Sequence, residues 1–213
     1  MKFNYNFKNH VLIVLILLVY AFICAVSYVD AVSNDISNSV FRLHVIANSD
    51  SEEDQNLKLL VRDSVLDYMN SIAKDAKSKE DVINLVNEHK DDFYNVARNT
   101  ITKNGYDYDV NINIGNFEFP TKNYGDISLP AGYYDALRIE IGNHEGKNWW
   151  CVMFPPLCFV DISSGIVEDD SKELMKDNLT EEEFNIVSED NTEYKVKFKL
   201  IELLSVFTAN LDK

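Results

Sequence analysis

The stretch that most constrains the fold is Gly146 to Asp161, which reads GKNWWCVMFPPLCFVD. It holds both tryptophans of the chain, two of its three cysteines and two of its four prolines. Trp149 to Phe154 is aromatic and apolar, the composition of a buried strand. Pro155 and Pro156 must end that strand, because proline has no N–H to donate to a ladder. We therefore predict a strand over Trp149 to Phe154 and then a rigid corner carrying Leu157, Cys158 and Phe159.

Two interpretations of this strand and corner remain open. They could form a central strand and its exit loop, closing a hydrophobic core. They could also form an aromatic surface that a partner recognises, since aromatic anchors are frequent at binding hot spots. On the second interpretation the candidate partner-binding residues come from the strand, the corner and the aromatic segment before them: Trp149, Trp150, Phe154, Pro155, Pro156, Leu157, Phe159, Tyr124 and Tyr133.

An uncharged apolar run, Val11 to Val29, follows a short segment with two lysines. This order is typical of an export signal that places the rest of the chain outside the cytoplasm. As a helix the run would be roughly 28 Å long against a bilayer core of about 30 Å, so a cleaved signal peptide and a retained anchor both fit. Signal peptidase could cut after Ser27 or after Ala31, where small residues stand at the required positions. Residues 1–31 are therefore a signal peptide or signal anchor, and the only part expected to contact a membrane.

The formal net charge is −15, from 20 basic and 35 acidic residues. A strongly acidic chain repels the phosphate backbone, so we expect no nucleic-acid partner. With 46% hydrophobic residues the chain can bury the core of a single domain.

The first half of the exported part predicts one strand and two helices. Phe41 to Asn48 alternates, with Arg42 and His44 on the face opposite Leu43. A serine- and acid-rich segment then precedes a helical stripe that ends near Ile72, so its carboxylates are interpreted as helix caps. A second stripe runs from Ser78 to the helix stop at Asn104-Gly105.

The second half predicts three strands and an irregular tail. Tyr108 to Ile114 alternates, Phe117 to Tyr134 has no sustained period and is expected to be a loop, and Leu137 to Ile141 alternates again. The short polar link to the Trp149 strand predicts an antiparallel hairpin. Residues 168–190 are expected to be mobile or loosely helical, and a C-terminal helix is expected over residues 194–207.

These elements predict an α+β fold. After the N-terminal segment we expect a single β-α-α-β-β-β domain over residues 32–165, with a mostly antiparallel sheet and helices on one face. Residues 166–213 would form an acidic segment and the C-terminal helix.

No catalytic motif is evident in the sequence. A phosphate-binding glycine loop, paired zinc-spaced histidines and a Gly-x-Ser-x-Gly elbow are all missing from it. Cys151 with His44 or His144 could form a thiol nucleophile and its base, which is a weak signal on its own. Cys151 and Cys158 do not have a usual zinc spacing. We therefore expect no catalytic residue, no metal and no cofactor.

Cys151 and Cys158 are the cysteines that remain after the export signal. In an oxidising compartment they can form a disulfide that clamps the proline corner. Two buried free thiols are the alternative.

Three blocks together resemble the stage II sporulation protein R family of endospore-forming bacteria. The blocks are Phe41 to Asp54, Leu129 to Glu140 and Gly146 to Asp161. The resemblance implies a non-enzymatic signalling protein, exported from the forespore into the intermembrane space. There it would activate a membrane-embedded aspartic protease, stage II sporulation protein GA, which processes the precursor of sigma-E in the mother cell. The alternative is an exported thiol-dependent or cell-wall-acting hydrolase.

Overall fold

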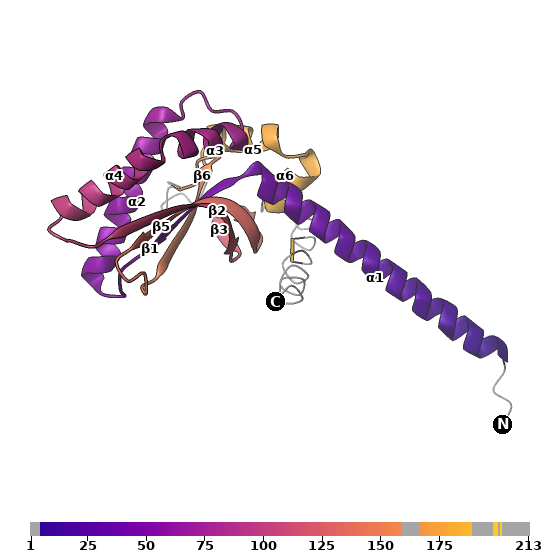
Figure 1. Cartoon of the computed structure of the whole chain (residues 1–213). Coiled ribbons are helices and arrows are strands. Elements are labelled where there is room, and N and C mark those ends of the chain that lie inside the picture. Colours follow the sequence, from indigo (N-terminus) through magenta and orange to yellow (C-terminus); the bar gives the residue numbers. More distant parts are fainter. Residues whose placement is uncertain (1–4, 159–166, 189–197, 200, 202–213) are drawn as a thin grey trace.

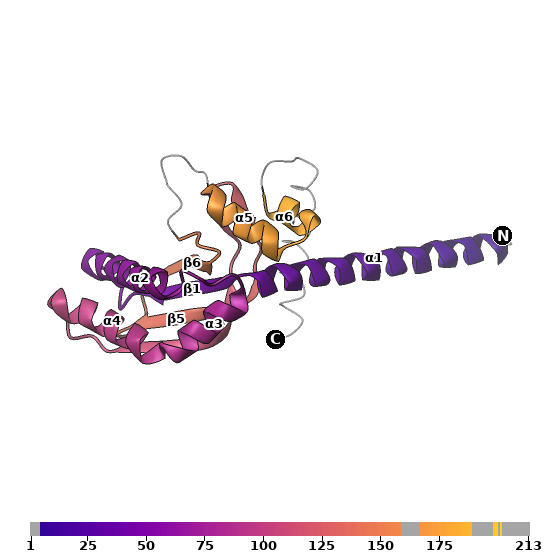
Figure 2. The same cartoon turned by 90° about the horizontal axis from the view of Figure 1, so that it is seen from above.

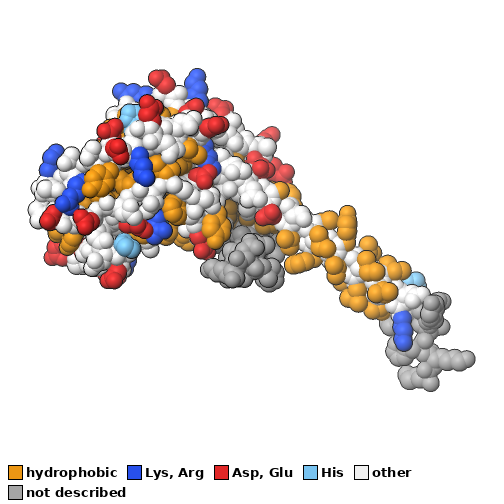
Figure 3. Space-filling view, in the orientation of Figure 1, with side chains coloured by type: hydrophobic (Ala, Val, Ile, Leu, Met, Phe, Trp, Pro, Cys, Tyr) orange, Lys and Arg blue, Asp and Glu red, His pale blue; other side chains and the backbone are white. Residues whose placement is uncertain are grey.

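A long N-terminal helix projects from an α+β domain in the computed structural model of the chain (Figure 1). The structure describes residues 5–158, 167–188, 198, 199 and 201. The helix, α1, spans Tyr5–Ser39, and its N-terminal part exposes Val11 to Leu18 to solvent. By length and composition α1 could cross a membrane, although export signals pass the same test. Figure 3 shows the apolar surface of this projecting part beside a domain surface of mixed charge.

The C-terminal part of α1 belongs to the domain. Val29, Val32 and Ile36 are buried and join the same hydrophobic core as the sheet. Their spacing of three and four residues places them on one side of the helix, which therefore buries an apolar stripe against the domain. The hydroxyl of Tyr28 also donates a hydrogen bond to Glu182, with 2.8 Å between the oxygens. The helix thus continues past residue 31 without a linker.

The main sheet has four strands in the order β2-β5-β1-β6. The strands are β1 (Phe41–Ile46), β2 (Val110–Phe119), β5 (Gly132–Ile141) and β6 (Asn148–Phe154). β1 pairs with β5 in parallel, whereas β1 with β6 and β2 with β5 are antiparallel. The α+β class and the mostly antiparallel sheet are confirmed.

The predicted hairpin between β5 and the Trp149 strand is wrong. β1 lies between β5 and β6, so the link from Gly142 to Lys147 crosses over the end of β1. The crossing is close: the Gly146 N–H donates to the carbonyl of Ala47 at 3.0 Å, and a Cβ on Gly146 would lie 2.2 Å from the carbonyl oxygen of Ser49. A short polar link can connect two strands that pair directly or two strands that have one strand between them. The composition of the link does not distinguish these two arrangements.

The predicted irregular loop over residues 117–134 is also wrong. β2 continues to Phe119 and β5 already begins at Gly132, and the two strands pair along this whole extension. Between them a two-stranded hairpin forms from β3 (Lys122–Tyr124) and β4 (Ile127–Leu129). Prolines at 120 and 130 mark the breaks between these strands, and they obscured the strand period in the sequence.

Three helices cover one face of the sheet (Figures 1 and 2). They are α2 (Glu52–Ile72), α3 (Lys79–Glu88) and α4 (Lys90–Lys103). Ser51 caps α2, and Ser78 forms a capping box with Asp81 at the start of α3. The single helix predicted from Ser78 to Asn104 is wrong, because the helix is interrupted at His89, which ends α3 and precedes α4.

Two short helices follow the sheet: α5 (Asp169–Asn178) and α6 (Glu181–Val187). In Figure 2 they are separated from α3 and α4 over most of their length, but the end of α5 reaches the start of α3, where the side chain of Asn178 donates to the carbonyl of Lys77 at 3.4 Å. The acidic segment is therefore helical, with Met175, Ile186 and Val187 buried. The C-terminal helix predicted over residues 194–207 lies largely outside the described residues.

Candidate functional site

The two faces of the sheet carry different chemistry. Side chains alternate along a strand, so Leu43, Val45 and Ile139 form the apolar face under the helices. The opposite face carries charged and aromatic side chains from all four strands. We call it the polar face, and it consists of Arg42, His44, Phe117, Phe119, Tyr134, Arg138, Glu140 and Trp150.

Arg42 is the most deeply buried charge on the polar face, with a fully buried side chain. Its guanidinium lies 4.1 Å from the centre of the Phe119 ring and 4.6 Å from that of Tyr134. Such ring contacts stabilise a cation by about 0.5–2 kcal/mol each, whereas burying an ion costs several kcal/mol. Atoms Nε and Nη1 have no hydrogen-bond partner among the described residues.

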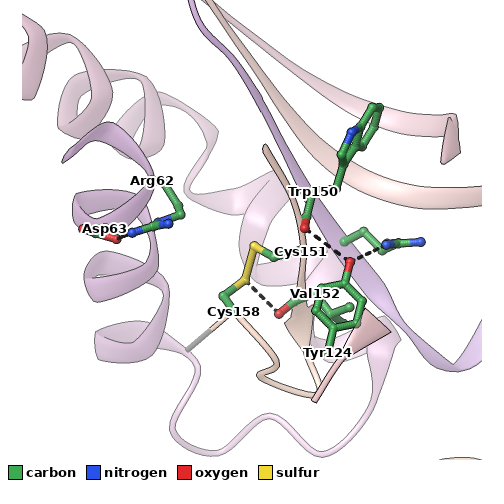
Figure 4. The surroundings of a disulfide bond; sticks show 8 residues. Arg62, Asp63, Tyr124, Trp150, Cys151, Val152 and Cys158 are labelled. Atoms are coloured by element: carbon green, nitrogen blue, oxygen red, sulfur yellow. Dashed lines mark hydrogen bonds and ion pairs between the residues drawn. A yellow bond between two sulfur atoms is a disulfide. The ribbon is translucent and has the colours of Figure 1, made fainter. Parts of the chain in front are cut away.

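The β3–β4 hairpin lies over Arg42. Arg42 Nη2 donates to the hydroxyl of Tyr124 at 2.5 Å. That hydroxyl donates to the carbonyl of Trp150 at 3.3 Å (Figure 4). The turn of the hairpin is held by Asp126, whose carboxylate accepts from the backbone of Val167 at 3.0 Å and from the ammonium of Lys172. α5 therefore fixes the hairpin that covers the arginine.

His44 lies beside Arg42 on the same face. Its Nε2 donates to the side-chain oxygen of Asn148 at 2.7 Å, and its ring stacks on Trp150. Burial lowers the pKa of His44 to about 4, and the cations of Arg138 and Arg42 act in the same direction. The ring is therefore neutral at pH 7, with a lone pair on Nδ1 that no described group donates to.

Arg138 continues the polar face on β5, directly opposite His44. Its guanidinium forms an ion pair with Glu140 at 2.7 Å and lies 5.4 Å from the centre of the Phe117 ring. Its Nε has no partner in the described part of the chain. With Arg42, Arg138 and Glu140 ionised and His44 neutral, these four groups carry a net charge of +1 in a chain of net charge −15.

The two tryptophans lie on opposite faces of β6, as alternation predicts. Both are partly buried. Trp150 packs on the polar face, 4.7 Å from the ring of Phe119. Trp149 packs on the helix side, where the guanidinium of Arg62 lies 4.2 Å from its ring centre. Of the two, only Trp150 belongs to the polar face.

The other candidate partner-binding residues divide by exposure. Phe154, Pro155, Leu157 and Tyr124 are buried. Pro156 is exposed, and Tyr133 is 53% exposed. Phe159 lies outside the described residues.

Cys151 and Cys158 are joined as a disulfide in the structure, with 5.1 Å between their Cα atoms (Figure 4). Cys151 is buried on the helix side of β6, opposite Leu43 of β1, so it does not face His44. His144 lies in the exposed link after β5. The structure therefore does not bring together the thiol and histidine that the hydrolase alternative needs. In the described ranges no group of three or more His, Cys, Asp or Glu side chains could hold a metal ion.

A separate cleft of about 630 Å³ lies between the end of α1, the start of α3 and the α5–α6 corner. Its walls include Asp35 and Glu183, and burial together with Glu183 raises the pKa of Asp35. Lys79 on the same wall is paired with Asp135 at 2.7 Å. The cleft marks the seam along which α1 docks onto the domain.

The acidic block after β1 has a structural role. The buried carboxylate of Asp54 accepts hydrogen bonds from the side chains of Asn48 and Ser49, at 2.8 and 2.6 Å. The backbone N–H of Lys147 donates to Asp50 at 2.7 Å. These bonds tie the start of α2 to the link that crosses β1. The side-chain cap of α2 is Ser51, whose hydroxyl accepts from the N–H of Asp54 at 3.2 Å.

Sequence reasoning missed Arg42 as a site residue and considered His44 only as a base for Cys151. Both were assigned to the less apolar face of the first strand, where exposed polar groups are ordinary. Their burial depends on the β3–β4 hairpin, which sequence patterns did not predict. The one available signal was the placement of two large basic side chains on a strand whose other positions are apolar.

Comparison with known proteins identifies the family of the chain. A family model described as Stage II sporulation protein R (spore_II_R) matches residues 37–164, a range that holds the main sheet, α2 to α4 and the disulfide. Stage II sporulation protein R of Bacillus subtilis (strain 168) is 37% identical over 185 residues, which cover 80% of this chain and 82% of that protein. No solved structure shows a significant match. The resemblance seen in the three sequence blocks is confirmed, and the chain belongs to the stage II sporulation protein R family.

Proposed function

We propose that this protein is the exported signal that activates the membrane-embedded aspartic protease stage II sporulation protein GA. It acts in the space between the forespore and mother-cell membranes, and the result is processing of the sigma-E precursor in the mother cell. Membership of the sporulation family supports the cellular setting.

The observation that carries the proposal is the way the domain is attached to α1. The helix exposes apolar side chains over residues 11–23 and buries Val29, Val32 and Ile36 in the domain core. The folded domain therefore begins at the end of the apolar segment. Before any cleavage, this arrangement holds the domain next to the outer surface of the membrane that α1 enters. A membrane protease is within reach from that position.

The polar face supports a role in recognition. Trp150, Arg138 and Phe117 are partly buried there and keep part of their surface in solvent. Tryptophan and arginine are the residue types most enriched at binding hot spots. These side chains are preorganised by stacking and by the Arg138–Glu140 ion pair, so little freedom is lost when a partner covers them.

The test is reconstitution in a bacterium that forms no spores. The protease, the sigma-E precursor and this chain are expressed together, and precursor cleavage is followed by immunoblot. Cleavage is expected with the full chain and is expected to be lost when residues 1–27 are deleted, because the domain then stays in the cytoplasm. Cleavage that continues without export would contradict the proposal.

Variants of the two tryptophans provide a matched control. Trp150→Ala and Arg138→Gln are expected to abolish activation while leaving a folded domain by circular dichroism. Trp149→Ala removes an equal ring from the opposite face, so it is expected to lower the stability of the domain. It is expected to leave activation unchanged when equal amounts of folded protein are compared. Equal loss of activation in the Trp149 and Trp150 variants would remove the polar face from the proposal. Activity of the purified domain on peptidoglycan, lost in Cys151→Ala, would instead support the hydrolase.

A further inference from the structure

The unpaired charge of Arg42 points to a ligand. Salt bridges in the described part of the chain neutralise Arg62, Arg98 and Arg138, but none reaches Arg42. Its side chain is fully buried, and Nε and Nη1 have no acceptor in hydrogen-bonding geometry among the described groups. The hydroxyl of Tyr134, which donates to the carbonyl of Pro130, is a further polar neighbour of the guanidinium. A buried cation normally has a charged partner, because isolated burial is strongly unfavourable.

The groups around Arg42 add further unused hydrogen-bonding capacity. His44 Nδ1 and Arg138 Nε are also buried and unpartnered within the described residues. His44 is two residues from Arg42 on β1, and Arg138 is opposite His44 on β5. Three neighbouring side chains on one face of the sheet therefore carry unsatisfied polar atoms.

We propose that the polar face is a binding site for a carboxylate, with Arg42 as its principal receptor, and that its natural ligand is an acidic segment of a protein partner. A carboxylate matches the planar guanidinium and can accept from two of its N–H groups. Flat aromatic walls on Phe119 and Tyr134 suit a planar anion carried on a side chain. A phosphate would bring nearly two charges to a face whose net charge is +1, so it fits less well.

The hydroxyl of Tyr124 occupies the place where a carboxylate oxygen would bind. It is the acceptor that Arg42 Nη2 now uses, at 2.5 Å. A ligand carboxylate would replace it, and the β3–β4 hairpin would move away from the sheet as it did so. Tyr124 thus competes with the ligand, which predicts opposite effects for changes at Arg42 and at Tyr124.

The test uses the full chain in a nonionic detergent, with sodium acetate as the probe and sodium chloride at equal ionic strength as the reference. The Nε–H resonance of Arg42 is followed by ¹⁵N NMR and assigned by its loss in Arg42→Gln. Acetate is expected to shift this resonance saturably and to raise the thermal unfolding midpoint. In Arg42→Gln the acetate concentration for half-maximal stabilisation is expected to rise about tenfold or more, since a charge-assisted hydrogen bond is lost.

Tyr124→Phe keeps the ring and removes the competing hydroxyl, so acetate is expected to bind more tightly than to the original chain. Tyr94→Phe, on the exposed side of α4, and Arg62→Gln, whose guanidinium already has Asp63, serve as matched controls and are expected to leave acetate binding unchanged. If Arg42→Gln does not fold, acetate binding by Tyr124→Phe and the shift of the Arg42 Nε–H resonance in the original chain still test the proposal.

Peptide probes then separate the possible sources of the carboxylate. A Gly-Glu repeat peptide with an amidated end presents side-chain carboxylates, and a glycine peptide with a free end presents only its terminus. Stronger competition with acetate by the first supports an acidic segment as the ligand, and stronger competition by the second overturns that assignment in favour of a chain terminus. An Arg42 resonance that acetate leaves unmoved overturns the site. A resonance that chloride moves equally means an adventitious ion only and also overturns it.

Discussion

His44 and Trp150 face each other across the β1–β6 pairing, with ring centroids 3.6 Å apart and ring planes inclined by 18°. The tryptophan covers one side of the imidazole, and Asn148 fixes its Nε2–H. Because burial disfavours the charged form, the folded chain holds this ring neutral, with a pKa of about 4. The stack therefore links the stability of the domain to pH.

The first prediction is a loss of stability between pH 6.5 and pH 4. In the unfolded chain this histidine has a pKa near 6.5 and binds a proton below that pH. In the folded chain it binds the proton only near pH 4. His44 therefore does not reduce the free energy of unfolding above pH 6.5. As the pH falls below 6.5 the free energy of unfolding decreases, by roughly 3 kcal/mol near pH 4. Urea unfolding of the original chain and of His44→Gln across this range would measure the difference.

His144→Asn is the control, because His144 is exposed and its backbone φ of 47° suits asparagine. It keeps His44, so it is expected to show the same loss of stability between pH 6.5 and pH 4 as the original chain. A pH profile for His44→Gln that parallels the original chain would contradict the prediction.

The sequence predicted the elements that depend on local pattern. Alternation placed Leu43 and His44 on opposite faces, and proline chemistry ended β6 before Pro155, as the structure has it. The serine- and acid-rich segment before α2 and Ser78 before α3 were expected to start helices, and Ser51 and Ser78 cap them in the structure. These features are determined by neighbours a few residues apart.

Features that depend on distant contacts could not be predicted in the same way. β1 lies between β5 and β6, so Leu43 and Val45 pair on both sides, and no local pattern encodes this order of strands. The burial of Arg42 requires Tyr124, which is 82 residues away in the chain. A single sequence gives the period of each strand but not its neighbours.

The second prediction concerns the crossing of β1 by the β5–β6 link. A Cβ at Gly146 would lie 2.2 Å from the Ser49 carbonyl oxygen, which is backbone and cannot move aside easily. Gly146→Ala is therefore expected to destabilise the domain by several kcal/mol. Gly115→Ala is the control, since its nearest contact would be an ordinary 3.6 Å to the Phe117 ring. Similar urea midpoints for the two variants would show that the crossing is looser than the structure has it.

The third prediction concerns Cys151 and Cys158. Closing this short loop is expected to stabilise the domain by about 2.5 kcal/mol in the chain-entropy model. Replacing both cysteines with alanine should lower the stability by about that amount and make it insensitive to reductant. In the denatured original chain, alkylation is expected to label only Cys24 before reduction and all three cysteines after it. Three labels without reductant would mean that the two thiols are free.

The fourth prediction distinguishes the two possible signal-peptidase sites by the stability of the product. A cut after Ser27 leaves Tyr28 and Val29 on the domain, whereas a cut after Ala31 removes both. Val29 is 6% exposed and packs in the core, and Tyr28 donates to Glu182. Losing one buried valine and one exposed hydrogen bond is expected to cost about 2 kcal/mol. Chains that begin at residue 28 and at residue 32 should therefore differ by that amount in urea unfolding.

Two point variants of the chain that begins at residue 28 locate the source of this difference. Val29→Ala is expected to reproduce about half of the loss, while Asp30→Ala, at an exposed neighbouring position, is expected to change little. If the export signal is cleaved in vivo, N-terminal sequencing of the exported protein is then expected to read from Tyr28, because that product keeps the α1 stripe intact. Equal stability of the two truncated chains would mean that the start of this stripe does not stabilise the domain, and the structure would then give no reason to prefer the cut after Ser27.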